Sequence, residues 1–432
     1  MSFAVLRTWT TAGFGGLLLL GAVLTASAQP APDSLDEVRV RLHHQAEIER
    51  VKLTVEDGPL AVHLPSGGTP IMRLQTGETL VAGVRQQDVY VRRGGSGLYA
   101  TKLRLQPAGA DATWALSFEE HEDRTYTGGL YLAPAAEMES SLLLVNAVPL
   151  EDYVASVVAS EYGLDDTEGT KAMAVVARTY GLFASAKFGG AYDQADGTAS
   201  QVYAGVESVT DRSRSAAQAT QGEVLTYDGN LIQSVYFSSS GGHTADNEDV
   251  WKADEALPYL RGREDPYDEA SPHHTWSATV DRSALLQTLT RHQGSLVEGF
   301  VIDEKVPHGR VETVRILQSQ GSDPVMKAND FRLLVNRGVD GAPLKSTWFS
   351  ARRQGDRYVF DGRGFGHGVG LSQWGAHAMA ERGKSYREIL RFYYTGVDIE
   401  EVEGVEFDPV KAPVAKTPSP AEVDTSGRRI GW

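Results

Sequence analysis

The 432-residue chain contains no cysteine, which excludes a disulfide framework, a lipid-modified N-terminal cysteine and any zinc site built on thiolates. Basic residues are in deficit, with 41 Lys and Arg against 57 Asp and Glu and a formal net charge of −16. Because phosphate binding needs clustered basic side chains, this balance argues against nucleic acid as a partner. With 41% hydrophobic residues, the chain is expected to be globular with a substantial core.

Long hydrophobic runs are also missing beyond residue 28, and the one at the N-terminus reads as part of a secretory signal peptide, residues 1–28. Arg7 precedes an apolar run over residues 12–24, and the small residues Ala26 and Ala28 follow it. Since this run is shorter than the roughly 20 residues that span a bilayer, a permanent anchor is the weaker alternative. We expect cleavage after Ala28 and an exported protein that is soluble in the periplasm or cell envelope.

The pattern along the chain predicts an α+β fold. Residues 36–143 alternate short apolar runs with Gly, Asp and Pro, which is typical of strands and turns. Residues 144–400 mix helical and strand patterns and form the expected catalytic region, as one extended unit or two lobes around a groove. Residues 409–432, rich in Pro, Lys, Ser and Thr, are expected to form a disordered tail.

The segment LEDYVASVVASEYG predicts a helix with an acidic residue on its apolar face. Val154, Val157, Val158 and Glu161 are spaced at i, i+3, i+4 and i+7, and Gly163 follows the expected end. Partial burial and the negative end of the helix dipole both disfavour a charged carboxylate. We therefore expect a raised pKa for Glu161, as a general acid needs. A helix-terminal glutamate that simply points into water is the alternative that spacing leaves open.

Four separated blocks of sequence resemble the stage II sporulation protein D family, which includes the amidase-enhancer proteins. They are LEDYVASVVASEYG, KAMAVVARTYGL, FSSSGGHTADNEDVW and GRGFGHGVGLSQWGA, in the family's order, and the resemblance covers roughly residues 144–397. The family's enzyme is a lytic transglycosylase that favours peptidoglycan strands stripped of their stem peptides, so the resemblance implies that activity here. Its catalytic glutamate ends the first block and matches Glu161.

The resemblance also implies roles for Lys171, Arg178 and Tyr180, which match cleft residues in the family's second block. Lys171 and Arg178 lie two turns apart on a helix predicted over residues 170–187, so they project in similar directions. We expect this face near Glu161, where the two cations would hold the substrate's lactyl carboxylate or N-acetyl groups. Ordinary exposed helix charges are the alternative.

The loop SSSGGHTADNEDVW resembles the loop that borders the family's cleft and supplies Ser240, Gly241, Gly242 and His243 as expected substrate-binding residues. The two glycines permit positive φ and close approach of a sugar, whereas His243 could equally serve a hydrogen bond within the loop. Some relatives hold zinc with cysteines in and after this loop. A site here would need His243, His367 and carboxylates, so we expect no metal and no other cofactor.

The glycine-rich stretch GRGFGHGVGLSQWGA does not have the spacing of a nucleotide-binding loop, so no nucleotide is expected. Its alternate glycines predict a tight turn that enters a helix. His367 and Gln373 would then face either a neighbouring element or the glycan, and both are candidate substrate-binding residues.

A single carboxyl group suits the implied chemistry. A hydrolase flanks the scissile bond with two carboxylates. In a lytic transglycosylase the muramic acid's own hydroxyl attacks, so one Glu can protonate the leaving oxygen and then accept the hydroxyl proton, giving a 1,6-anhydro product. One alternative is a hydrolase that uses Asp165 or Asp166 as second carboxylate. Another is a noncatalytic wall-binding protein that enhances an N-acetylmuramoyl-L-alanine amidase.

The expected partners are therefore peptidoglycan glycan strands and, in the second alternative, a cell-wall amidase. One departure from the family pattern bears on substrate preference. Many relatives have Glu-Met-Pro and then a Trp after the first helix, whereas this chain has Glu161, Tyr162 and Gly163 with no Trp before Lys171. We therefore expect a different floor to the cleft.

Overall fold

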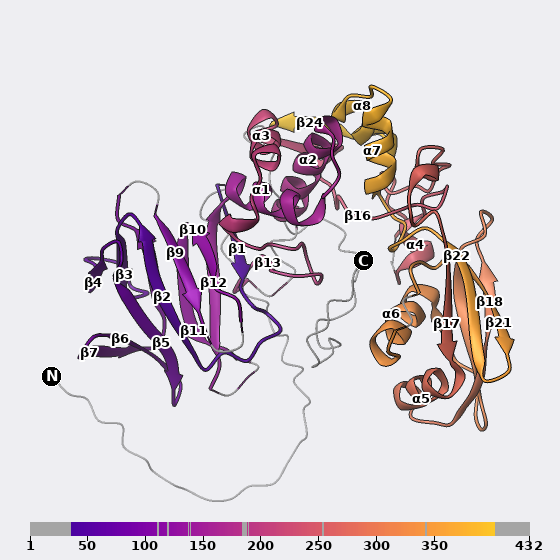
Figure 1. The fold of residues 1–432 in the computed structure, drawn as a ribbon, viewed down its shortest axis with the longest axis horizontal. Helices are drawn as coiled ribbons and strands as arrows, with labels where there is room; N and C mark the ends of the chain where they lie inside the picture. Colours follow the sequence, from indigo (N-terminus) through magenta and orange to yellow (C-terminus); the bar gives the residue numbers. More distant parts are fainter. Residues whose placement is uncertain are drawn as a thin grey trace, which may run out of the picture.

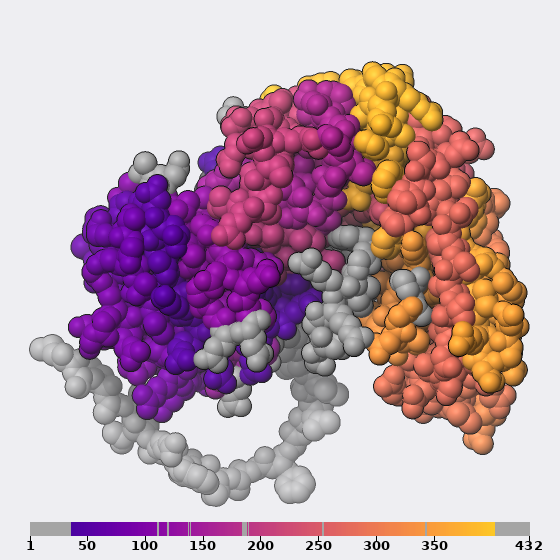
Figure 2. Space-filling view, in the orientation of Figure 1, coloured from indigo at the N-terminus to yellow at the C-terminus, as the bar shows by residue number. Residues whose placement is uncertain are grey.

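The computed structural model of the protein describes residues 36–401, apart from 110–111, 119–120, 137, 139, 184–187, 189, 253–254 and 342–343. The expected signal peptide at 1–28 and tail at 409–432 lie outside the described residues. Strands and helices occur in several separate sheets, which confirms the α+β fold. Figure 1 shows a strand-rich N-terminal region, a helical centre and a C-terminal module in succession, and Figure 2 shows them as an arch.

The N-terminal region consists of two antiparallel sheets with a shared core. Strand β2 alternates buried and exposed residues, and buried residues of both sheets join one hydrophobic cluster, as in a sandwich. Its strands are β1 (Glu37–Arg41), β2 (Arg50–Asp57), β3 (Leu60–His63), β4 (Met72–Leu74), β5 (Thr79–Arg85), β6 (Asp88–Arg93), β7 (Ser96–Ala100), β8 (Leu103–Pro107), β9 (Thr113–Ser117), β10 (Arg124–Thr127), β11 (Gly129–Pro134) and β12 (Leu142–Pro149). The sheet orders are β13-β1-β12-β11-β8-β3-β4 and β10-β9-β2-β5-β6-β7.

The helical centre follows directly from β12. Helix α1 (Leu150–Glu161) begins after Pro149, with two acidic residues in its first turn where the dipole favours them. This confirms the first predicted helix. The second, α2 (Thr167–Phe183), begins three residues before the predicted start at 170, and residues 184–187 of the prediction lie outside the described part. Two later helices, α7 (Gln373–Glu381) and α8 (Tyr386–Tyr393), pack against α2.

Shorter elements connect these helices. They are β13 (Gln194–Ala195), η2 (Val206–Ser208), α3 (Asp211–Ala219), β14 (Glu223–Tyr227), β15 (Asn230–Leu231), β16 (Tyr236–Phe237), α4 (Asn247–Val250), η3 (Asp268–Ala270), β23 (Leu371–Ser372) and β24 (Asp398–Glu401). The stretch LIQSVYFS, residues 231–238, does not form one continuous strand and contributes only to the short β15 and β16. Within the described residues, no helix has both the length and the hydrophobicity to cross a membrane.

The C-terminal module is inserted into the helical centre. Its elements are β17 (Thr275–Asp281), α5 (Arg282–Gln293), β18 (Val297–Lys305), β19 (Val311–Gln318), β20 (Val325–Lys327), α6 (Ala328–Gly338), β21 (Phe349–Gln354) and β22 (Arg357–Arg363). They enclose a hydrophobic core of their own. The chain leaves after His274 and returns at Gly364, whose N–H lies 3.0 Å from the carbonyl oxygen of His273 and 3.2 Å from that of His274.

The N-terminal region also positions a segment of the centre. Strand β13 pairs in parallel with β1. On either side of it, Asp193 forms an ion pair of 2.7 Å with Arg39, and Asp196 lies 2.8 Å from Nδ1 of His44. The segment that follows, residues 197–203, is therefore anchored to the edge of the sandwich.

Candidate active site

Glu161 lies at the last position of α1, where the apolar stripe ends. Val154, Val157 and Val158 are buried, as their spacing predicts, and Glu161 is partly buried. Its Oε1 accepts a hydrogen bond of 2.7 Å from the backbone N–H of Val202, 41 residues further along the chain. The anchored segment after β13 therefore fixes the position of this carboxyl group.

Two buried tyrosines and a glutamine lie beside Glu161. The hydroxyl of Tyr153 donates to Oε1 of Gln201 at 2.8 Å, and Nε2 of Gln201 donates to the hydroxyl of Tyr236 at 3.3 Å. Burial raises the pKa of both phenols well above the usual value, and the negative charge of Glu161 acts in the same direction. Tyr153 and Tyr236 therefore stay protonated beside Glu161.

Tyr180 belongs to the same group of residues. It is buried in α2, and its charge, like that of Glu161, raises the pKa of Tyr153 and of Tyr236. Since such an influence needs proximity, Tyr180 and Glu161 face the same pair of tyrosines. The structure therefore brings this predicted residue close to the carboxyl group, although it is largely covered by protein.

Gln373 and His367 join the glycine-rich loop to this group. Nε2 of Gln373 donates to the backbone carbonyl of Glu161 at 2.9 Å, which ties the start of α7 to the end of α1. His367 donates from Nε2 to the carbonyl of Tyr236 at 2.9 Å and accepts at Nδ1 from the N–H of Val369 at 3.1 Å. Burial lowers the pKa of His367 to about 3, so the ring is neutral and both its nitrogens are engaged by backbone.

The loop that begins at Ser238 is organised by a buried carboxylate, Asp268, which the sequence did not single out. Asp268 accepts hydrogen bonds from the N–H groups of Ser240 and Gly241 at 2.9 and 2.8 Å. It also accepts from the hydroxyls of Ser239 and Ser372 at 2.8 and 3.1 Å. Ser240 is itself fully buried, so its side chain is not presented to a ligand.

Gly241 and Gly242 have φ values of 70° and 110°, the positive φ that the sequence predicts for them. A Cβ at Gly241 would lie 2.6 Å from the backbone nitrogen of Gly364, so the close approach here is between two loops. The ring of His243 stacks on that of His308 at 4.2 Å, in contact with the C-terminal module.

Arg310 fastens the module to this loop. Its Nη2 donates to the carbonyl oxygens of Ser240 and His243 at 2.7 and 3.0 Å. The side chain is fully buried, and burial lowers its pKa to about 10, so it keeps its charge at neutral pH. A Cβ at Gly368 would lie 2.8 Å from the guanidinium carbon, which explains the need for glycine there.

The expectation that Arg178 lies near Glu161 is wrong. Arg178 is 0% exposed, and its Nε and Nη2 donate to the two carboxylate oxygens of Glu151 at 2.9 and 2.6 Å. Its other bonds go to backbone carbonyls, including those of Ala217 and Glu223. Because Glu151 begins α1 and Glu161 ends it, about 15 Å of helix separates them. Arg178 is a buried structural cation and cannot hold a substrate group.

Lys171 projects toward α8 rather than toward Glu161. Its Nζ lies 2.8 Å from Oε1 of Glu168 and 5.8 Å from the centre of the Tyr386 ring. The seven-residue spacing did place Lys171 and Arg178 on one side of α2, but that side packs against β14 and α8. Helical periodicity relates residues of one helix to each other and does not say which neighbour they meet.

Asp165 and Asp166 are both engaged away from Glu161. The side chain of Asp165 is 88% exposed and pairs with Arg212. Asp166 accepts from the hydroxyl of Tyr162 at 2.8 Å and lies 2.7 Å from Nδ1 of His377 in α7. Tyr162, which directly follows Glu161, therefore helps to hold the α1–α2 loop on α7.

The zinc site of some relatives has no counterpart in the residues named for it. His367 uses both ring nitrogens for backbone, and Nδ1 of His243 lies 2.6 Å from the carbonyl of Thr244. In the part of the chain that the structure describes, no three His, Cys, Asp or Glu side chains gather as metal ligands would. These residues do not fit a zinc ion, and the chemistry below uses none.

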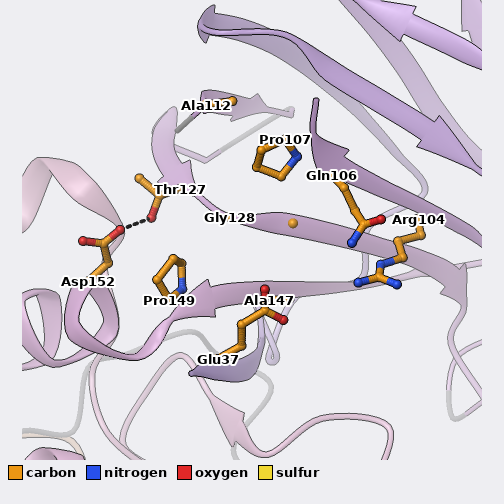
Figure 3. Close-up of a pocket in the computed structure, with 11 residues that line it drawn as sticks. Glu37, Arg104, Gln106, Pro107, Ala112, Thr127, Gly128, Ala147, Pro149 and Asp152 are labelled. Atoms are coloured by element: carbon orange, nitrogen blue, oxygen red, sulfur yellow. Dashed lines mark hydrogen bonds between the residues drawn. The ribbon is translucent and has the colours of Figure 1, made fainter. Parts of the chain in front are cut away.

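A small pocket of about 120 Å³ lies elsewhere, at the start of α1 (Figure 3). Arg104, Gln106 and Glu37 come from the sandwich, and Asp152 from α1 accepts from the hydroxyl of Thr127 at 2.9 Å. Ligand pockets for organic molecules typically hold about 300 Å³ or more, so this one is too small for a disaccharide. It also lies at the opposite end of α1 from Glu161.

Gln201, Val202, Tyr153 and Tyr236 are contacts of this site that sequence analysis did not identify, and the first two had the weakest signal. Gln201 and Val202 follow β13 in an irregular segment without helical or strand periodicity, so no pattern marked them. The available signal is chemical: Asp193 and Asp196 precede residues 197–206, a stretch of small and apolar residues in which Gln201 carries the only amide side chain. A buried amide usually has partners, and here its partners are Tyr153 and Tyr236.

Comparison with known families divides the chain as the structure does. The model of a family described as stage II sporulation protein matches residues 138–227, which include α1, α2 and the segment after β13. A second model, for a domain of unknown function (DUF8618), matches residues 254–370 and so contains the inserted module.

Three curated relatives are similar over longer stretches. An uncharacterized protein of Brachyspira hyodysenteriae is 29% identical over 376 residues, 84% of this chain and 96% of that protein. Stage II sporulation protein D of Bacillus subtilis is 33% identical over 279 residues, 60% of this chain and 76% of that protein. The amidase enhancer of Bacillus subtilis is 30% identical over 277 residues, 54% of this chain and 38% of that protein.

Proposed function

Because this chain belongs to the stage II sporulation protein D family, we propose that it acts on the cell wall as a lytic transglycosylase. It would cleave the MurNAc–GlcNAc bond of peptidoglycan, preferably in peptide-stripped strands, and leave 1,6-anhydro-MurNAc ends. The observation that carries this proposal is the carboxyl group of Glu161, which is fixed by the N–H of Val202, next to the hydrogen-bonded chain Tyr153–Gln201–Tyr236. The nearby Asp165 and Asp166 are engaged elsewhere, which favours one-carboxylate chemistry over a hydrolase.

In this mechanism Glu161 acts twice. As an acid, its carboxyl donates a proton to the glycosidic oxygen, which leaves as the free 4-hydroxyl of GlcNAc while the C1–O bond of MurNAc breaks. The 6-hydroxyl of the same MurNAc then bonds to C1, and its proton passes to the ionised Glu161. Glu161 is protonated again at the end of each turnover, and neither water nor a cofactor is consumed.

Val202 and Gln201 have positioning roles in this proposal. A backbone N–H that donates to a carboxylate oxygen favours the ionised form, which is the form that accepts the hydroxyl proton. Gln201 holds Tyr153 and Tyr236 at fixed positions, so the dipoles near Glu161 need not reorganise as its charge changes. We include export by the N-terminal segment in the proposal, since peptidoglycan lies outside the inner membrane.

The test is mass spectrometry of the products released by the mature protein from intact and peptide-stripped strands. We expect anhydro-muramyl products from the wild type and none from Glu161→Gln, which keeps the shape of the side chain but cannot transfer a proton. The matched control is Asp165→Asn, an exposed carboxylate in the next loop, which should cleave as the wild type does. Reducing-end products lost in Asp166→Asn would replace this proposal with a hydrolase.

Similarity to the Bacillus subtilis amidase enhancer favours a second candidate, a noncatalytic wall-binding protein that stimulates an amidase. It predicts that neither wild type nor Glu161→Gln releases any product, while both raise the rate at which a cognate N-acetylmuramoyl-L-alanine amidase removes stem peptides. The same protein preparations therefore separate the two candidates.

A further inference from the structure

One end of the β17-β22-β21 sheet gathers side chains that the proposed reaction does not use. Thr275 at the start of β17 pairs with Arg363 at the end of β22, and Phe349 at the start of β21 pairs with the residue before Arg363. Antiparallel pairing thus brings His274, Arg363 and Trp348 together at one sheet end. The module lies on the right of Figure 1, on the far side of the helical centre from the N-terminal sheets.

Arg363 is an exposed cation at this sheet end. Its Nη2 lies 3.0 Å from Nε2 of His274, and its guanidinium carbon lies 5.2 Å from the centre of the Trp348 ring. Among the described residues it forms no ion pair with a carboxylate. In a chain with a net charge of −16, an arginine without an acidic partner is free to bind an anion.

Lys345 provides a second such cation. Its Nζ lies 3.1 Å from Nδ1 of His273 and 5.9 Å from the centre of the Phe365 ring, and no carboxylate of the described chain pairs with it. Burial and the charge of Lys345 lower the pKa of His273, so this ring adds no charge of its own at neutral pH. Each of the two cations thus lies beside a histidine ring and an aromatic ring.

His274 connects this sheet end to the loop beside Glu161. Since Arg363 can only donate, Nε2 of His274 accepts and Nδ1 carries the proton, which points to Asp268 at 3.3 Å. Asp268 in turn holds Ser240 and Gly241. These contacts fix Arg363 relative to the loop. The other N–H groups of its guanidinium remain for a ligand.

Aromatic rings lie beside the two cations. Trp348 and Phe365 are partly exposed, and the stacked rings of His243 and His308 continue the surface, with Trp348 and His308 at 5.9 Å between centres. Flat rings pack against apolar faces such as those of sugar rings, while a planar guanidinium binds a carboxylate through two parallel bonds. Together they suit a sugar that carries a carboxylate.

The surface is continuous with the candidate active site through the backbone. Phe365 and Ser239 pair through both backbone N–H groups, at 2.7 and 2.9 Å, and the N–H of Trp374 donates to the carbonyl of Ser238 at 3.0 Å. Gln373, one residue earlier, donates to the carbonyl of Glu161. These contacts connect the surface to the end of α1 that carries Glu161.

We propose that Arg363, Lys345, Trp348 and Phe365 form a second binding surface for the glycan strand, which takes the lactyl carboxylates of muramic acid residues away from the scissile bond. The proposal rests on the proposed function for the identity of its ligand. Its effect is on strand affinity and on the length of strand preferred, and it leaves the proton transfers at Glu161 unchanged.

The experiment measures binding by the full mature chain carrying Glu161→Gln, so that strands are not consumed. Two ligands of equal length are compared, peptide-free peptidoglycan strands and chitin oligosaccharides, which lack lactyl carboxylates. Adding Arg363→Met and Lys345→Met should weaken binding to the peptidoglycan strands at least tenfold and change binding to chitin oligosaccharides less than twofold. The matched control is Arg357→Met, an exposed arginine at the opposite end of β22, which should change neither.

Three results would overturn the proposal. The first is an unchanged affinity of the double variant for peptidoglycan strands, and the second is an equal loss of affinity for both glycans. The third is a loss of affinity for vesicles of anionic phospholipid with no loss for either glycan, which would make the surface a membrane contact. Arg363→Lys, which keeps the charge, should restore part of the affinity, and thermal unfolding of each variant separates lost binding from lost folding. The cleavage assay tests the proposed function separately. If the wild type cleaves no strand but the double variant binds peptidoglycan strands more weakly, the binding surface stands and the transglycosylase proposal is wrong.

Discussion

Glu161 is fixed by a group that does not titrate. The N–H of Val202 keeps its donor strength at every pH, so the carboxyl group stays in place whether it is protonated or ionised. The partial burial of Glu161 could be predicted from the spacing of three valines in its own helix. Its partner could not, because that contact depends on a distant segment held against β1 by Asp193 and Asp196.

Replacing Arg178 tests whether this arginine stabilises the fold, as its buried ion pair with Glu151 indicates. Replacing it by Met leaves Glu151 without its partner and several buried carbonyl groups without donors, so we expect Arg178→Met to lower the free energy of unfolding by about 3 kcal/mol. Lys171→Met, which removes a partly exposed pair on the same helix, should cost less than about 1 kcal/mol. Urea unfolding measures both. A stable Arg178→Met protein with a raised KM would return Arg178 to the substrate site.

At the scale of elements, local patterns predicted the two helices well and the loops only in part. The apolar stripe, Pro149 and the acidic first turn were enough to predict α1. Gly241 and Gly242 in the loop after Ser238 were predicted to have positive φ, and they do, but Asp268, which organises the loop, begins the distant short helix η3. Sequence periodicity carries no information about which loops contact each other. The conformation of the glycine-rich stretch depends on such contacts.

The glycine-rich loop should make the protein sensitive to acid. The pKa of His367 is about 3 in the folded protein, below its unfolded value of 6.5, because burial disfavours the charged ring. As pH falls, the unfolded chain takes up the proton first. Stability from this residue is therefore complete above pH 6.5 and is lost progressively toward pH 3, by about 5 kcal/mol in total.

Chemical unfolding at a series of pH values tests this expectation. His367→Gln cannot titrate, so its free energy of unfolding should fall less steeply between pH 6.5 and 4 than that of the wild type. Some slope should persist, since burial also lowers the pKa of His43 to about 4. Identical slopes in the two proteins would show that His367 does not couple folding to protons.

For the whole molecule, the sequence was informative about class and poor about architecture. Strand-rich composition before residue 144 and mixed composition after it were visible, whereas the separate module was not, because residues 275–360 show no clear periodicity. The structure resolves this stretch into two three-stranded sheets and two helices around one core. Short strands paired over long sequence distances leave weak local signals.

The two cores predict two cooperative units. One core joins the sandwich to the helices on both sides of the insertion, and the other is confined to the module. We expect calorimetry to show two transitions, and amide hydrogen exchange in β17–β22 to follow a different opening free energy from that in α1 and α2. Arg310→Met, which cuts a link between the units, should move the transitions further apart. A single transition with uniform exchange would mean that the cores unfold as one.

The chain enters and leaves the module at neighbouring points, His273 and Gly364, and this has an evolutionary consequence. A host gene could acquire or discard the intervening stretch in one event, because the flanking residues already lie within hydrogen-bonding distance and a direct peptide connection would span them. Relatives that share α1 and α2 are therefore free to differ in this stretch. Specialisation for different walls can then proceed without altering the helix that carries Glu161.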